Sequence, residues 1–326
     1  MSKSQRVRVT FVCESSATQR VVEQLNSDAS AIPQPQLSTL PSDQTTAEIS
    51  SDWIAATDQV SANSLRQMLA AVSERLHGGS DPAVIVVHPS KAIPRHLLER
   101  FPESLHPWLR PVSAGALRLL RITDTRNAAD LISRIRSAWP VLSLECDVAI
   151  DITTLPHLGP GKLTSLRCPV TDIQRATSFW KSNSTETQCV ESGLLLLHDH
   201  LDESHSISQA MEGLGKPQTG DYWHGIMHRR EPDAGNASYW FRRVGHHPAM
   251  DELGTQLIPW MTELGCSPAH LELATQTLVR KQLWDPAEMI RLSSIALRSR
   301  GSVTEQTCRI AQYLEMINLL AWSVSK

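Results

Sequence analysis

Apolar residues in the first half of the chain follow two alternating patterns, short continuous runs and helical spacing. Strands are predicted at the continuous runs, 7–13, 83–88, 117–122, 147–152 and 165–170. Apolar positions three and four residues apart predict helices at 18–25, 64–76, 94–100 and 127–139. This alternation favours an α/β domain, a doubly wound parallel sheet with helices on both faces.

The pattern changes after residue 190, where no convincing strand remains. Helix starts are indicated by two capping boxes, at 285–288 and 302–305, in which a polar side chain accepts backbone N–H groups. Gly245, Gly265 and Gly301 stand where helices should stop. The second half is therefore predicted to be an all-α, repeat-like array of about six or seven helices.

The length of the chain, 326 residues, exceeds that of a usual single hydrophobic core, so two domains are expected. Two polar stretches interrupt the apolar pattern, a long surface excursion at 28–52 and a linker near 181–188. The predicted division is an α/β domain at 1–180, a linker at 181–189 and a helical domain at 190–326.

The net charge of −3 provides no positive field that would hold nucleic acid or an anionic membrane. No segment has the length and apolar character of a signal peptide or a membrane span. The six cysteines are far apart and form no C-x-x-C pair, which is typical of reduced thiols. These features predict a cytoplasmic protein. The expected partner, another protein or a small anionic ligand, is inferred from residues 222–248, described next.

Residues 222–248 hold the densest group of side chains suited to binding or catalysis. They include two of the three tyrosines of the chain, two tryptophans, four histidines and four arginines. A helix beginning at Tyr222 should end before Pro232, because proline disfavours helical geometry in the residue before it. Asp233 should then cap a second helix that continues through Val244. We therefore expect this helix pair to carry the functional site.

His224 and His228 lie one turn apart on the first of these helices, and Glu231 follows on the same stripe. Two imidazoles and a carboxylate suit a divalent metal such as zinc or iron, with Asp233 or His205 completing the site. Metal-dependent hydrolysis is one activity that such a site predicts. The structural alternative is that the histidines border the core face of the helix and hydrogen-bond locally.

The second helix is amphipathic, with Trp240 and Phe241 on its core face. Tyr239, Arg242 and Arg243 gather on the opposite face, where guanidinium groups beside an aromatic ring are suited to hold a carboxylate or a phosphate. The alternative is that the arginines pair internally with nearby carboxylates. The predicted binding residues are His205, Trp223, His228, Arg229, Asn236, Tyr239, Arg242 and Arg243.

Residues 195–248 resemble an uncharacterised family of bacterial proteins. In that family a segment D-x-S-H-x-I-x-Q precedes the motif W-H-x-x-x-H-R-x-E-x-D-x-x-N-A-x-Y-W-[FY]-R-R. The matching residues here are Asp202, Ser204, His205, Ile207, Gln209, Trp223, His224, His228, Arg229, Glu231, Asp233, Asn236, Ala237, Tyr239, Trp240, Phe241, Arg242 and Arg243. This resemblance brings no activity with it. The helix pair is also similar to one unit of a tetratricopeptide-type repeat, which implies a binding or scaffold module.

The first predicted strand ends in Phe11-Val12-Cys13, and a loop and a helix follow. A thiol at a helix N-terminus has a lowered pKa, and the exposed amides there can bind an anion. This layout resembles the low-molecular-weight tyrosine phosphatases over about residues 6–139. The resemblance implies a nucleophilic Cys13, a phosphate-binding arginine and a general acid at Asp124.

This sequence departs from the phosphatase pattern at the positions that matter most. The sixth residue after Cys13 is Gln19, the arginine comes one residue late at Arg20, and Thr125 replaces the proline expected after Asp124. An arginine displaced by one residue points about 100° away on a helix. We therefore expect a phosphatase-like domain without phosphatase activity, beside a helical binding module. Residual phosphate or arsenate chemistry at the thiol is a further alternative.

Overall fold

The computed structural model describes most of the second half of the chain and selected segments of the first. The described residues are 8–13, 16–27, 36–41, 53–56, 62–76, 84–91, 93–109, 117–121, 142–149, 152, 155–160, 170–178, 184–214 and 218–324. The chain divides into two compact units. The first comprises residues 1–92, 112–154 and 164–167, and the second comprises residues 93–111, 155–163 and 168–326.

The first unit is built on a six-stranded mixed sheet with the order β2-β1-β3-β5-β4-β6. The strands are β1 (Arg8–Cys13), β2 (Gln36–Pro41), β3 (Trp53–Ala56), β4 (Val84–Lys91), β5 (Leu117–Arg121) and β6 (Leu142–Ala149). Strand β5 runs antiparallel to both of its neighbours, β3 and β4, and the other pairs are parallel. The sheet is therefore mixed: three of its five strand pairs are parallel, as predicted, and two are antiparallel. An apolar run indicates burial on both faces but not strand direction.

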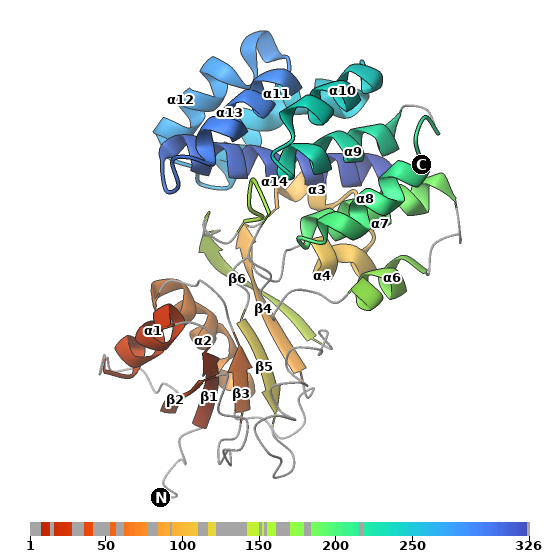
Figure 1. The fold of residues 1–326 in the computed structure, drawn as a ribbon. Coiled ribbons are helices and arrows are strands. Elements are labelled where there is room, and N and C mark those ends of the chain that lie inside the picture. Colours follow the sequence, from red (N-terminus) through yellow and green to blue (C-terminus); the bar gives the residue numbers. More distant parts are fainter. Residues whose placement is uncertain are drawn as a thin grey trace, which may run out of the picture. The chain divides into compact units, whose positions relative to one another are not determined.

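Helices α1 (Ser16–Ser27) and α2 (Ala62–Leu76) contact each other and cover one face of this sheet (Figure 1). Phe11 and Trp53 are fully or almost fully buried beneath them, and the indole nitrogen of Trp53 donates a hydrogen bond to the carbonyl oxygen of Leu76 at 3.2 Å. Ile54 and Leu120 point to the opposite face, because successive strand residues alternate, and they are buried too. Both faces of the sheet therefore carry buried apolar side chains.

Several predicted elements are confirmed, among them the strands at β1, β4 and β5 and the helices α1 and α2. Strand β6 begins earlier than the predicted 147–152. Strand β2 lies inside 28–52, which was predicted to be a surface excursion. It is an edge strand in which Leu37 is buried and Ser38 is exposed, so its apolar signal is weak. Asp124 and the predicted helix at 127–139 lie outside the described residues.

The second unit is helical. Its helices are α3 (Arg95–Leu98), η1 (Glu103–Leu105), α4 (His106–Leu109), α6 (Val170–Ser178), α7 (Thr185–Leu197), α8 (Leu201–Ala210), α9 (Thr219–Arg230), α10 (Ala234–Val244), α11 (Pro248–Glu263), α12 (Pro268–Thr277), η3 (Arg280–Gln282), α13 (Pro286–Ala296) and α14 (Val303–Val324). Helix α14 is buried along most of its length and contacts α7, α11, α12 and α13, which surround it (Figure 1). None of the helices in the described part of the chain is both long and apolar enough to cross a membrane.

The observed division differs from the predicted boundaries. Residues 184–189, placed in the predicted linker, begin helix α7, because the Ser184 hydroxyl accepts a hydrogen bond from the Thr187 N–H at 3.2 Å. Helices α3, α4 and α6, placed in the predicted α/β domain, belong to the helical unit. His198 Nε2 lies 2.8 Å from the carbonyl oxygen of Trp108 and joins α7 to α4. Polar residues in a first helical turn resemble a linker in sequence.

The predicted helix boundaries of the second unit are largely confirmed. The Asp285 carboxylate accepts hydrogen bonds from the N–H groups of Ala287 and Glu288, and the Ser302 hydroxyl accepts one from the N–H of Glu305. Gly245, Gly265 and Gly301 all have positive φ angles at helix ends. The described residues between 185 and 324 form eight α-helices, whereas about six or seven were predicted.

Candidate functional site

Helix α9 carries the centre of the candidate site and is buried from Gly220 to Arg230. It begins at Thr219, three residues before the predicted start. Glycines allow its close packing: a Cβ atom on Gly193 of α7 would lie 2.5 Å from the Trp223 ring. A Cβ atom on Gly225 would lie 3.1 Å from the ring of Phe241 on α10. Trp223, predicted as a binding residue, is instead part of the core.

Three histidines converge where α8 packs against α9. His205 comes from α8, and His224 and His228 come from α9. One ring nitrogen of each lies within 4.8 Å of the others. The His224 and His228 rings are stacked with their centroids 4.7 Å apart, and the His205 ring lies 4.9 Å and 5.2 Å from them. The structure therefore brings together a set of donors suited to one metal ion.

Contacts with neighbouring side chains orient two of these imidazole rings. The Nδ1 atom of His228 donates a hydrogen bond to the Glu231 carboxylate at 3.0 Å, which leaves its Nε2 atom as the free donor of an electron pair. The Trp240 indole stacks on His224 with a centroid separation of 3.9 Å. Glu231 was predicted as a metal ligand, but it orients His228, and His205 provides the third imidazole.

The ring nitrogens of His224 have no hydrogen-bond partner among the described residues, although the residue is only 1% exposed. Burial, together with the nearby His228, His205 and Arg243, lowers the pKa of His224 to about 3. Burial also lowers the pKa of His228, against the opposing effect of the Glu231 charge. Both rings are therefore neutral at neutral pH, the form in which imidazole binds metals.

Arg229 and Arg230, at the end of α9, have structural partners. Nη2 of Arg229 donates to Oε2 of Glu315 on α14 at 2.5 Å, and the Tyr222 hydroxyl donates to Oε1 of the same carboxylate at 3.0 Å. Arg230 pairs with Asp199 and donates hydrogen bonds to two backbone carbonyl groups. The prediction that Arg229 binds a ligand does not fit these contacts, because its charge is compensated inside the core.

The arginines of α10 differ from each other. Nη1 of Arg243 lies 2.6 Å from the Glu212 carboxylate and 3.2 Å from the Tyr239 hydroxyl, and Nε lies 3.4 Å from the buried Asp221. Internal pairing therefore accounts for Arg243. Arg242 is exposed and makes no hydrogen bond or ion pair within the described part of the chain.

Two further predicted residues form a helix cap. The Asp233 carboxylate accepts hydrogen bonds from the Asn236 N–H at 2.9 Å and from the Asn236 side chain at 2.8 Å. The first hydrogen bond holds the pKa of Asp233 below its usual value. Both residues therefore have a structural role at the start of α10, as the position of Asp233 predicted.

The phosphatase-like constellation is described only in part. Cys13 ends β1, but its side chain is not among those described, and Asp124 is outside the described residues. Arg20 is exposed on α1. The amide of Gln19, which occupies the position of the expected arginine, donates a hydrogen bond to Glu23 at 2.9 Å. A neutral amide at this position does not provide the positive charge that an arginine would offer to a phosphate group.

Sequence reasoning missed Glu315, the buried carboxylate that holds both Arg229 and Tyr222. The sequence contains a signal for it, because Glu315 is the one charged residue in the mostly apolar stretch from Ile310 to Leu320. A charged residue in such a run is seldom buried without a partner. Comparison of the chain with family models, with curated proteins and with solved structures finds no match.

Proposed function

We propose that the helical unit binds a divalent metal ion through His205, His224 and His228. The convergence of three imidazole nitrogens within 4.8 Å supports this proposal. The unpartnered ring of His224 supports it further, because a buried polar group without a partner costs about 1–3 kcal/mol. Coordination of a metal ion would offset this cost.

The donor set favours zinc or a similar transition metal. Neutral imidazoles suit zinc, iron, copper and nickel, whereas calcium and magnesium require oxygen ligands. A zinc ion held by three imidazoles would keep a fourth position for water and would lower the pKa of that water to about 7. Metal-dependent hydrolysis is therefore the activity that we propose for the site. Glu231 supports it by orienting His228.

Metal titration tests the binding proposal. Protein freed of metal by a chelator should bind one equivalent of zinc in calorimetry, and cobalt should give the absorption bands of a tetrahedral site. His205→Ala and His224→Ala should each abolish tight binding. His270→Ala is the matched control, because His270 is a buried histidine paired with Ser267 and Gln306. Absence of binding by the wild-type protein, or equal loss in the control, would refute the proposal.

Turnover separates the proposed activity from thiol chemistry. An aryl acetate and an aryl phosphate should be tested with the zinc-loaded and the chelated protein. Hydrolysis that requires zinc and is lost in His205→Ala supports the metal site. Hydrolysis that persists in chelator and is lost in Cys13→Ser would instead assign the chemistry to the first unit.

Four other predictions from the sequence are independent of the metal site. A scaffold function, a tetratricopeptide-like repeat, a doubly wound phosphatase-like first unit and a cytoplasmic location all stay predictions. Binding of a small anion at Arg242 is the part of the binding hypothesis that helix α10 supports. The charge of Arg242 has no partner in the described residues.

A further inference from the structure

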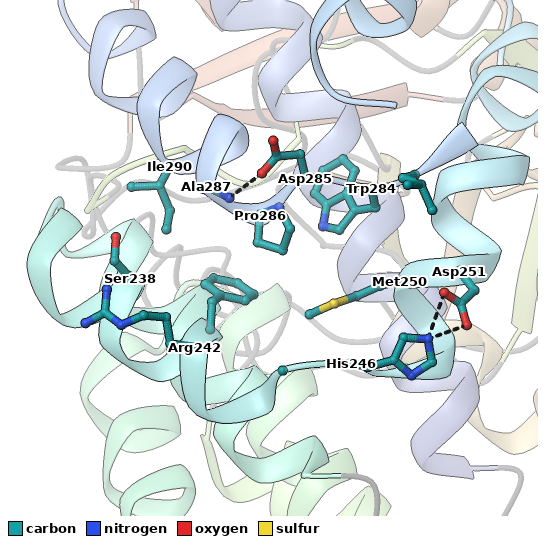
Figure 2. Close-up of a pocket in the computed structure, with 13 residues that line it drawn as sticks. Ser238, Arg242, His246, Met250, Asp251, Trp284, Asp285, Pro286, Ala287 and Ile290 are labelled. Carbon is teal, nitrogen blue, oxygen red and sulfur yellow. Dashed lines mark hydrogen bonds and ion pairs between the residues drawn. The ribbon is translucent and has the colours of Figure 1, made fainter. Parts of the chain in front are cut away.

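A pocket with a volume of about 560 Å³ opens between α10, the start of α11 and the start of α13 (Figure 2). Ligand pockets of roughly 300–1,000 Å³ are typical for small organic molecules. None of the three histidines of the proposed metal site lines it. The pocket is therefore a second candidate site in the helical unit.

The walls of this pocket are apolar. Phe241, Met250, Trp284 and Ile290 line it, and each is at least nine-tenths buried. Figure 2 shows Ile290, Trp284 and Met250 around the hollow, with Arg242 on the α10 side. A ligand with an apolar body would remove these remaining surfaces from water.

The charged side chains at the rim of the pocket differ in whether they already have a partner. Asp251 pairs with His246 at 2.9 Å, and the Asp285 carboxylate accepts two backbone N–H groups at the start of α13. Arg242 is exposed and has no partner in the described part of the chain. Among the described residues of the lining, Arg242 is therefore the cation that an anionic ligand can reach.

We propose that this pocket binds a small organic anion, with its carboxylate or sulfonate on Arg242 and its apolar body against Phe241, Met250 and Trp284. A guanidinium group pairs with such anions through two parallel hydrogen bonds. The apolar walls provide affinity, and Arg242 provides the preference for an anion over a neutral molecule of the same shape. The proposal rests on the small anion proposed above for Arg242 and is independent of metal binding.

Two fluorescent probes with the same ring system test the role of the charge. Anilinonaphthalene sulfonate carries an anion, and N-phenylnaphthylamine is its neutral counterpart. Arg242→Gln should weaken binding of the sulfonate at least about tenfold, because a hydrogen bond to a charged group contributes roughly 1.5–3 kcal/mol. Binding of the neutral probe should not change. Arg243→Gln is the matched control, since the adjacent arginine is absent from the pocket lining.

A second variant tests the location. Ala287 is an exposed residue of the pocket lining, so Ala287→Trp fills the hollow without removing a core side chain. It should weaken binding of both probes while the melting temperature stays close to that of the wild type. Unchanged binding in Ala287→Trp would overturn the proposal. So would a loss of sulfonate binding that is equal in Arg242→Gln and Arg243→Gln.

Discussion

Two buried polar clusters share helix α9, and they differ in how well their charges and hydrogen bonds are matched. In the arginine cluster, both carboxylate oxygens of Glu315 accept hydrogen bonds, one from Arg229 and one from Tyr222. Two other nitrogens of Arg229 lack partners, but its charge is compensated. In the histidine cluster, His224 has no partner among the described residues at either ring nitrogen.

This difference separates a structural role from a binding role. A buried charge that meets its counter-ion stabilises the native arrangement of helices, and removal of one partner is costly. A buried ring without a partner destabilises the protein until something binds it. The same helix therefore supports the fold through Arg229 and offers a binding site through His224. Substitutions that keep the shape of a side chain and change its polarity can test this distinction.

The largest expected effect is at the arginine cluster. Glu315→Gln leaves the Arg229 charge buried without a counter-ion and should lower the free energy of unfolding by about 3–5 kcal/mol. The measurement is urea denaturation followed by circular dichroism. Glu288→Gln makes the same chemical change in an ion pair with the exposed Arg291, and the loss there should be far smaller. Equal losses in the two variants would show that the arginine cluster has no special structural role.

The histidine cluster should respond in the opposite direction. In chelator, His224→Phe removes two unpartnered nitrogens and retains the ring on Trp240, so the free energy of unfolding should rise by about 1 kcal/mol. His270→Phe makes the same change where Ser267 and Gln306 hold the ring, and the free energy of unfolding should fall by about 1–3 kcal/mol. A decrease in both variants would show that His224 has a structural partner and would weaken the metal proposal.

Sequence patterns predicted the local parts of this site well. The i, i+4 spacing placed His224 and His228 together, and Pro232 and Asp233 marked the junction between α9 and α10. These are short-range features, determined by helical periodicity and by capping chemistry. Helical spacing in the sequence is therefore sufficient to identify His224 and His228 as candidate metal ligands.

Contacts between distant residues could not be predicted in the same way. Arg229 meets Glu315 across 86 positions of sequence, and His205 reaches the histidine pair because α8 packs beside α9. The antiparallel direction of β5 also depends on chain connections that an apolar run does not encode. Tertiary packing determines all three features.

The smallest expected effect concerns the two arginines of α10. Arg243→Gln removes an ion pair with the buried Asp221 and should lower the melting temperature. The decrease should be slight, because the Asp221 carboxylate keeps its hydrogen bond from the Gly213 N–H. Arg242→Gln should leave the melting temperature unchanged, since this exposed side chain has no partner in the described residues. Differential scanning calorimetry of the two variants measures the difference directly. If Arg242→Gln melts as early as Arg243→Gln, then Arg242 takes part in a structural pair, and its charge is not available to an anion in the pocket.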